Sequence, residues 1–208
     1  MNSLREWRLK SGAVMFGAAR YTAVAALVGL SIGARADSVA GKVMAGDTAL
    51  VGAVISIEGA HGHASPAAMH AVIDQQDKAF NPHVVAVMKG GTVEFRNSDD
   101  FLHNTFSTSK TGTFNLSQPG RGSRSLLKVD KVGPIDVRCH IHASMHAWIV
   151  VVDTPYFAVS DARGLFHIAG VPPGTYTVKV WSEKSGALTE KLTVTASSEA
   201  RLLVKYSK

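Results

Sequence analysis

The alternation of apolar and polar residues after residue 36 is typical of β-strands. Short runs such as Val39–Val43, Val84–Met88 and Ile135–Cys139 are rich in β-branched residues and are bounded by Gly, Pro, Asp or Asn, the composition of strands separated by turns. Residues 147–152 are continuously apolar, as expected for a strand buried on both faces. No segment has an apolar stripe with the 3.6-residue period of a helix. The pattern predicts an all-β protein.

Two further stretches complete this prediction. Residues 97–123 are rich in Ser, Thr, Asn, Asp and Gly, which favours long loops with at most a short strand at residues 113–115. After Asp153 the alternation resumes, and the turn residues Pro172-Pro173-Gly174 separate two of its strands. We expect a meander of strands that continues to Tyr206.

The first 36 residues resemble an export signal. Arg5, Arg8, Lys10 and Arg20 precede or flank an apolar run over residues 22–34, and Ala34-Arg35-Ala36 fits a small-x-small cleavage site. This predicts a signal peptide over residues 1–36 and a periplasmic protein with no membrane segment after cleavage. An uncleaved anchor over residues 15–33 is the alternative.

Cleavage also changes the charge. The whole chain has a net charge of +6, but the first 36 residues hold five basic and one acidic side chain, so residues 37–208 carry a net charge of +2. No basic run is interleaved with aromatic residues. Nucleic acid is therefore not an expected partner.

Candidate chemistry lies around the chain's single cysteine. Cys139 is followed by His142 and Met145, and His103 lies upstream. A thiolate, two imidazoles and a thioether form the donor set of a mononuclear electron-transfer copper site. Zinc also accepts Cys and His ligands, but Met is a poor ligand for it, which favours copper. A lone cysteine buried as a small apolar residue is the plainest alternative.

A family resemblance supports copper. Two stretches carry it. The first is Gly91-Thr-Val93-Glu-Phe95-Arg-Asn97-Ser-Asp99, followed by His103-Asn104, and the second is Cys139-x-x-His142-x-x-Met145, which runs into Ile149-Val150-Val151. Together they resemble the plastocyanin-like cupredoxins, especially their periplasmic methylamine-utilisation-like group. The resemblance implies a cupredoxin Greek-key β-sandwich over residues 69–152, with one copper ion held by His103, Cys139, His142 and Met145. Plastocyanin has four residues between its second His and its Met, whereas this chain has two, so His146 is a rival to Met145 as the axial ligand.

A second resemblance covers the rest of the chain. Asp161-x-x-Gly164-x-Phe166-x-Ile168, then Val171-Pro-Pro-Gly174-x-Tyr176-x-Val178, is similar to the carboxypeptidase-regulatory-like, transthyretin-like β-sandwich. The family's opening strands match residues 38–58. We therefore expect a small sandwich formed by residues 38–58 and 153–208 and split by the copper domain. The alternative is that residues 38–58 belong to the copper domain.

Three functions follow, in order of preference. The first is a periplasmic carrier of single electrons that turns over no substrate and meets a redox partner protein; we expect no enzyme activity, because no hydrolase or phosphate-binding motif is present. The second is copper binding for delivery or resistance, favoured by additional histidines. These are His61, His63, His140 and His146. The third is a structural or interaction module with a secondary metal site. The sequence leaves the oligomeric state open.

Overall fold

The computed structural model describes residues 37–206, and within them it confirms the all-β class. Seventeen strands and one short 3₁₀ helix, η1 (Pro66–Met69), account for the regular structure. Among the described residues, no helix is long and apolar enough to cross a membrane. The predicted signal peptide, residues 1–36, lies outside the described part of the chain.

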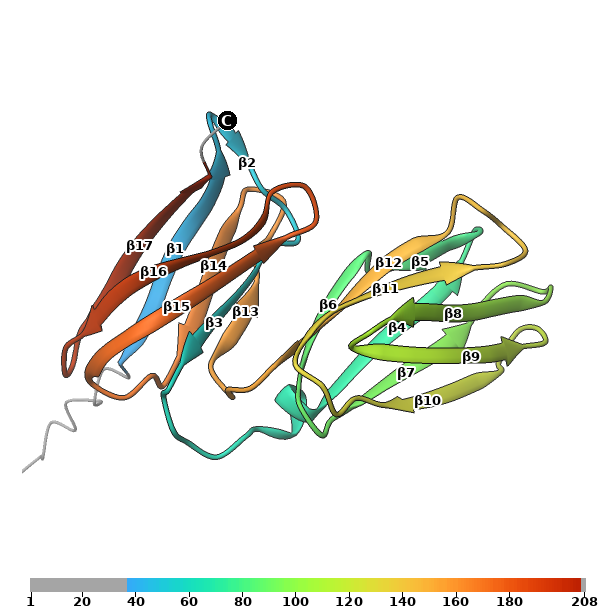
Figure 1. The fold of residues 1–208 in the computed structure, drawn as a ribbon, viewed down its shortest axis with the longest axis horizontal. Helices are drawn as coiled ribbons and strands as arrows, with labels where there is room; N and C mark the ends of the chain where they lie inside the picture. Colours follow the sequence, from blue (N-terminus) through green and yellow to red (C-terminus); the bar gives the residue numbers. More distant parts are fainter. Residues whose placement is uncertain (1–36, 207–208) are drawn as a thin grey trace, which may run out of the picture. The chain divides into compact units, whose positions relative to one another are not determined.

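Nine strands between residues 70 and 152 form two sheets (Figure 1). One sheet has the order β10-β7-β4-β5 and the other β6-β12-β11-β8-β9. The strands of the first sheet are β4 (His70–Gln76), β5 (Ala79–Asn81), β7 (Thr92–Asn97) and β10 (Arg124–Lys128). Those of the second are β6 (Val84–Met88), β8 (His103–Ser109), β9 (Gly112–Gln118), β11 (Gly133–Cys139) and β12 (His146–Val152). We call this pair of sheets the central sandwich.

The alternation seen in the sequence explains the core of the central sandwich. Apolar residues at every second position turn inward and form one buried cluster. It includes Ile73, Phe95, Val137, Cys139 and Ile149. Cys139 is thus buried at the end of β11, among apolar side chains from both sheets.

The remaining strands come from both sides of this segment and form two other sheets. Their orders are β14-β1-β17, with β2 paired to β1, and β13-β3-β15-β16. The strands are β1 (Ser38–Ala45), β2 (Thr48–Ala49), β3 (Val54–Glu58), β13 (Phe157–Val159), β14 (Leu165–Ala169), β15 (Gly174–Ser182), β16 (Gly186–Val194) and β17 (Glu199–Tyr206). We call this pair of sheets the flanking sandwich.

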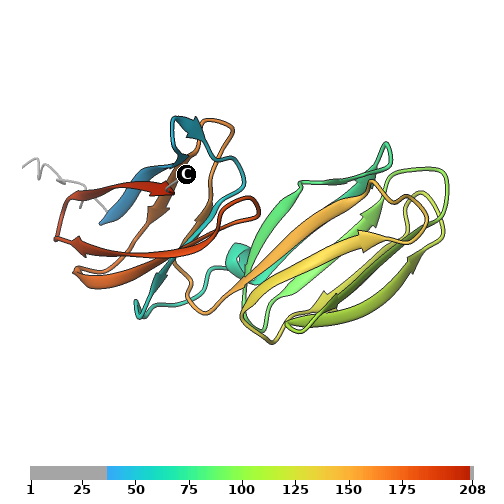
Figure 2. The same cartoon turned by 45° about the horizontal axis from the view of Figure 1, so that its top comes forward.

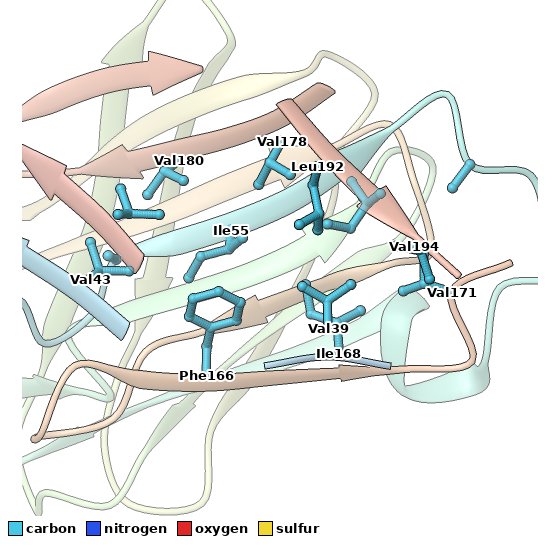
Figure 3. Packing of buried hydrophobic residues seen from close by; sticks show 14 of the residues in the cluster. Val39, Val43, Ile55, Phe166, Ile168, Val171, Val178, Val180, Leu192 and Val194 are labelled. Atoms are coloured by element: carbon cyan, nitrogen blue, oxygen red, sulfur yellow. The ribbon is translucent and has the colours of Figure 1, made fainter. Parts of the chain in front are cut away.

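Long-range pairing holds the flanking sandwich together. β1 runs parallel to β17 and antiparallel to β14, while β3 pairs with β13 and β15. Its core is almost wholly apolar, and Figure 3 shows Val39, Ile55 and Phe166 pointing toward one another between the sheets. Figure 2 shows the same strands from a second direction. The exact domain boundaries and the transthyretin-like kinship stay predictions.

The structure corrects the prediction of long loops over residues 97–123. Two seven-residue strands, β8 and β9, lie there and pair with each other over their whole length. Both are rich in Ser, Thr and Asn. Phe114 and Leu116 of β9 pack against the apolar core, but the inward positions of β8 are polar, with His103, Thr105 and Ser107 buried. An apolar pattern could not reveal strands whose buried side chains are satisfied by hydrogen bonds instead.

Candidate metal centre

The structure brings His103, Cys139 and His142 together at one end of the central sandwich. His103 begins β8, and Cys139 ends β11 directly opposite Thr105 of the same sheet. His142 lies in the turn that follows β11. One donor atom from each of the three lies within 4.8 Å of the other two, and the Nδ1 atoms of the two histidines are 3.3 Å apart.

The turn after Cys139 explains this convergence. The backbone N–H of Met145 donates a hydrogen bond to the carbonyl of His142 at 3.0 Å, which closes a tight turn before β12 begins. The turn folds His142 back toward the end of β11. Met145 is 1 % exposed and packs in the same apolar cluster as Cys139. A buried thioether therefore lies in the cluster that surrounds the thiol.

The ring of His103 is oriented by a carboxylate. Its Nε2 lies 2.8 Å from Oδ2 of Asp99, and both side chains are buried. Because an ionised carboxylate only accepts hydrogen bonds, the proton of a neutral His103 ring is on Nε2, and its Nδ1 carries a lone pair toward His142. This is the usual support of a metal-binding histidine, in which the outer nitrogen donates to a carboxylate.

Asp99 is itself held by the backbone. It accepts hydrogen bonds from the N–H groups of Asp77 at 2.8 Å and Lys78 at 3.1 Å, in the turn between β4 and β5. Burial alone would raise the pKa of Asp99, but hydrogen bonds from His103 and from these two backbone groups outweigh it and hold the pKa below its ordinary value. Asp99 is therefore ionised at neutral pH.

A second polar side chain shapes the loop between Asp99 and His103. Nδ2 of Asn97 donates to the carbonyls of Phe101 at 2.9 Å and Gln118 at 3.1 Å, and its Oδ1 accepts from the N–H of Asp99 at 2.9 Å. These bonds tie the end of β7 to the loop and to β9. The loop therefore delivers His103 in one defined position.

Aromatic and apolar side chains surround the histidines. The ring of Phe101 lies 5.1 Å from that of His103 and 5.6 Å from that of His142. Phe101, Leu102 and Ile141 are between 40 and 48 % exposed. His142 is only partly buried. The cluster is thus sealed on the protein side and reaches the surface through His142 and its apolar neighbours.

The two remaining histidines of this turn face elsewhere. The ring of His140 stacks on Phe106 with centroids 3.6 Å apart. The ring nitrogens of His146, the predicted rival to Met145, lie 2.9 Å from Oδ1 of Asp136 and 3.4 Å from Oε1 of Glu183. His146 is therefore engaged by carboxylates outside the cluster of His103, Cys139 and His142.

Sequence reasoning missed the role of Asp99. The residue lies in the Asn97-Ser98-Asp99 segment that carried the family resemblance, four positions before His103. A carboxylate this close to a metal-binding histidine is a signal for a supporting hydrogen bond. The Asp99 carboxylate reaches His103 only because the loop between them turns back on β8, which local sequence patterns do not determine.

No protein-family model matches the chain, and no curated protein matches it by sequence. Among solved structures, it is similar to amicyanin from Paracoccus versutus (18 % identity, TM-score 0.37, 47 % of this chain and 97 % of that one). It is also similar to a purple cupredoxin from Nitrosopumilus maritimus (21 %, 0.36, 39 % and 99 %). A copper-containing nitrite reductase from Thermus scotoductus SA-01 (24 %, 0.36) aligns with 54 % of this chain, which spans 25 % of that enzyme.

Proposed function

We propose that this protein binds one copper ion through His103, Cys139 and His142, with Met145 as a weak fourth ligand, and carries single electrons. The observation that carries the proposal is the convergence of the donors: two histidine Nδ1 atoms lie 3.3 Å apart beside the only cysteine of the chain. Cys and Met are soft donors that favour copper, and two imidazoles suit both of its oxidation states. Bound copper would supply a one-electron couple.

The protein's own residues would keep that couple fast. Asp99 fixes the ring of His103, the strand β11 fixes Cys139, and the hydrogen-bonded turn fixes His142. Donors held by a rigid scaffold change position little between the two oxidation states. Little reorganisation then accompanies transfer of the electron.

The same arrangement provides a surface through which the electron can be transferred. His142 is partly exposed, and Phe101, Leu102 and Ile141 form an apolar surface around it. Exposed apolar residues beside a functional group are typical of docking surfaces. We propose that a redox partner protein docks there.

We place this carrier in the periplasm, where the export signal predicted for residues 1–36 would deliver it. We also propose that it turns over no substrate of its own. The surroundings of His103, Cys139 and His142 support this, because the buried side of the cluster is lined by apolar residues and by ligand-supporting hydrogen bonds.

Copper titration of the full-length protein tests the proposal. Cu(II) should produce an intense thiolate-to-copper charge-transfer band in the visible spectrum, at one copper per chain. Cys139→Ser should abolish the band, whereas His140→Asn, the matched control in the same turn, should retain it because His140 stacks on Phe106 instead. A band retained in Cys139→Ser would overturn the ligand assignment. Binding of Cu(I) alone, without colour, would favour copper delivery over electron transfer.

The fourth ligand needs a test of its own. Met145→Leu conserves volume in the core, so the protein should stay folded while its spectrum and reduction potential change. His146→Gln should change neither, because His146 faces Asp136 and Glu183. The reverse result would make His146 the fourth ligand.

A further inference from the structure

A second group of metal-binding side chains lies outside the Cys139 cluster. His83 directly precedes β6, His146 begins β12, and Glu183 follows β15. One donor atom from each lies within 4.8 Å of the others. Nε2 of His83 is 2.7 Å from Oε2 of Glu183, and Nδ1 of His146 is 3.4 Å from Oε1 of the same carboxylate. Two histidines therefore converge on one glutamate.

The outer nitrogen of each histidine faces an acceptor oxygen. Nδ1 of His83 lies 2.9 Å from the backbone carbonyl of His146. Nε2 of His146 lies 2.9 Å from Oδ1 of Asp136 and is buried, although it is not aligned for a hydrogen bond. Outer nitrogens held by a carbonyl or a carboxylate are the usual support of metal-binding histidines.

These contacts determine whether the nitrogens that face Glu183 carry a proton or a lone pair. A carbonyl only accepts, so His83 carries a proton on Nδ1, and the neutral ring turns a lone pair on Nε2 toward Glu183. Likewise, a neutral His146 with its proton facing Asp136 turns a lone pair on Nδ1 toward Glu183. Lone pairs on two nitrogens then face carboxylate oxygens. Such an arrangement needs positive charge between the groups, from protons or from a cation.

Glu183 is ready to serve as an anion. Burial raises the pKa of Glu183, but when protons supply this positive charge, the hydrogen bonds and charges of His83, Trp148 and His146 together outweigh burial and hold the pKa below its ordinary value. At neutral pH the side chain is therefore a carboxylate. Two imidazoles and one carboxylate form the ligand set of open zinc sites, whose fourth position is taken by water.

We propose that His83, His146 and Glu183 bind one divalent ion of the zinc class, at a site separate from the Cys139 cluster. Ligand atoms on a tetrahedral zinc lie roughly 3.3 Å apart, given bonds of about 2.0–2.1 Å. The distance of 3.4 Å between His146 and Glu183 matches this value. The 2.7 Å contact of His83 with Glu183 needs to open by roughly 0.6 Å to reach it, and the exposure of both side chains permits this movement.

Such an ion would connect strands that are distant in sequence. His83 and His146 lie beside the parallel pair β6–β12 of the central sandwich, whereas Glu183 belongs to the turn between β15 and β16. A small apolar cluster joins the same elements, and within it the rings of Trp148 and Trp181 are 5.1 Å apart. The ion would thus reinforce a contact that the apolar side chains already make.

Zinc binding tests the site without relying on copper. Equilibrium dialysis with Zn²⁺ is carried out on full-length Cys139→Ser, which removes the sulfur ligand of the other cluster. We expect one strongly bound Zn²⁺ per chain. Adding Glu183→Gln or His83→Ala should weaken binding at least tenfold, the scale seen even for supporting residues of metal sites. Glu190→Gln is the matched control, since it removes an exposed carboxylate from β16 of the same hairpin.

Two results would overturn the proposed zinc site. Equal zinc affinity in Glu183→Gln and Glu190→Gln would overturn the proposal, as would the absence of strong zinc binding in Cys139→Ser. Protons alone would then neutralise the group. His83→Ala guards against misfolding of the glutamate variant, because His83 is about half exposed, and thermal melting without zinc checks that each variant is folded. The thiolate-to-copper band of the protein with Cys139 reports separately on the proposed electron-transfer site.

Discussion

The central and flanking sandwiches share a strand architecture but bury different residues. The flanking sandwich encloses an almost wholly apolar core, and its buried polar residues are mainly single serines. Ser160, for example, only joins the backbone of Leu50 and Ala53. The central sandwich buries a group of larger polar side chains around the start of β8. These are Gln75, Asn97, Asp99, His103, Thr105 and Gln118.

The difference indicates that the central sandwich uses buried polar side chains to position His103 and the end of β11. A buried polar group destabilises a protein unless it is hydrogen-bonded. Here the hydroxyl of Thr105, opposite Cys139, lies 3.1 Å from the side-chain oxygens of both Gln75 and Gln118. Such a network contributes less to stability than apolar packing would, but it defines the position of His103 and of the end of β11. The flanking sandwich has no comparable network among the described residues.

The largest effect should come from the core of the flanking sandwich. Ile55→Ala removes a side chain that is fully buried between its two sheets. We expect the free energy of unfolding to fall by about 2–5 kcal/mol, from lost transfer energy and the cavity left behind. Urea denaturation measures this loss. Leu203→Ala, at a position 57 % exposed on β17, is the control and should cost less than about 0.5 kcal/mol.

The comparison also requires that Ile55→Ala leave the metal centre intact. Without denaturant, the thiolate-to-copper band of the variant should equal that of the parent protein, because none of the donors comes from the flanking sandwich. A changed band would show that the core of the flanking sandwich also helps to position the metal-binding side chains of the central sandwich.

An intermediate effect is expected from the polar network of the central sandwich. Asp99→Asn retains size but replaces the carboxylate that orients His103. Loss of a supporting carboxylate typically weakens metal binding by about 10–100-fold, and we expect a loss of this size in copper affinity. Competition with a chelator measures it. Asp100→Asn, which removes only an exposed ion pair with Arg121, should leave the affinity unchanged. Equal affinities in the two variants would argue against a positioning role for Asp99.

The smallest effect concerns a buried charge away from the metal centre. A hydrogen bond from Arg96 is the main cause that holds the pKa of Glu94 below its ordinary value of 4.5, and the charges of Arg96 and Arg124 add to it. Because the folded pKa is depressed, this stabilisation is present above pH 4.5 and is lost as the pH falls through the lower, folded pKa. Exposed partners screen the pair, so its contribution is at most about 1 kcal/mol.

Glu94→Gln should therefore flatten the loss of stability below about pH 4.5. Urea midpoints measured between about pH 6 and pH 3 would show this. Copper affinity at neutral pH should not change, because Glu94 lies outside the network around His103. A parallel change in affinity would mean that polar burial throughout the central sandwich, and not only near β8, positions the donors.

The sequence by itself determined the fold class of the protein and named three candidate metal-binding side chains. Local alternation was enough to predict strands such as β1 and β11, because the inward and outward positions of a half-buried strand repeat every two residues. The continuous apolar run over residues 147–152 predicted β12. The spacing of Cys139 and His142 after an apolar strand, together with His103, was enough to name three side chains that the structure places together. Each of these signals depends on residues that are close in the sequence or on rare residue types.

Tertiary structure decided what depends on distant partners. β8 could not be predicted because its buried positions are polar and are satisfied by residues such as Gln75, 30 positions before Thr105. The contact of Asp99 with His103 depends on a loop folding back, and the group of His83, His146 and Glu183 joins three separate strand ends. Hydrogen bonds and ligand sets of this kind depend on the separation of atoms in space, which the folded sheets determine and local sequence patterns do not.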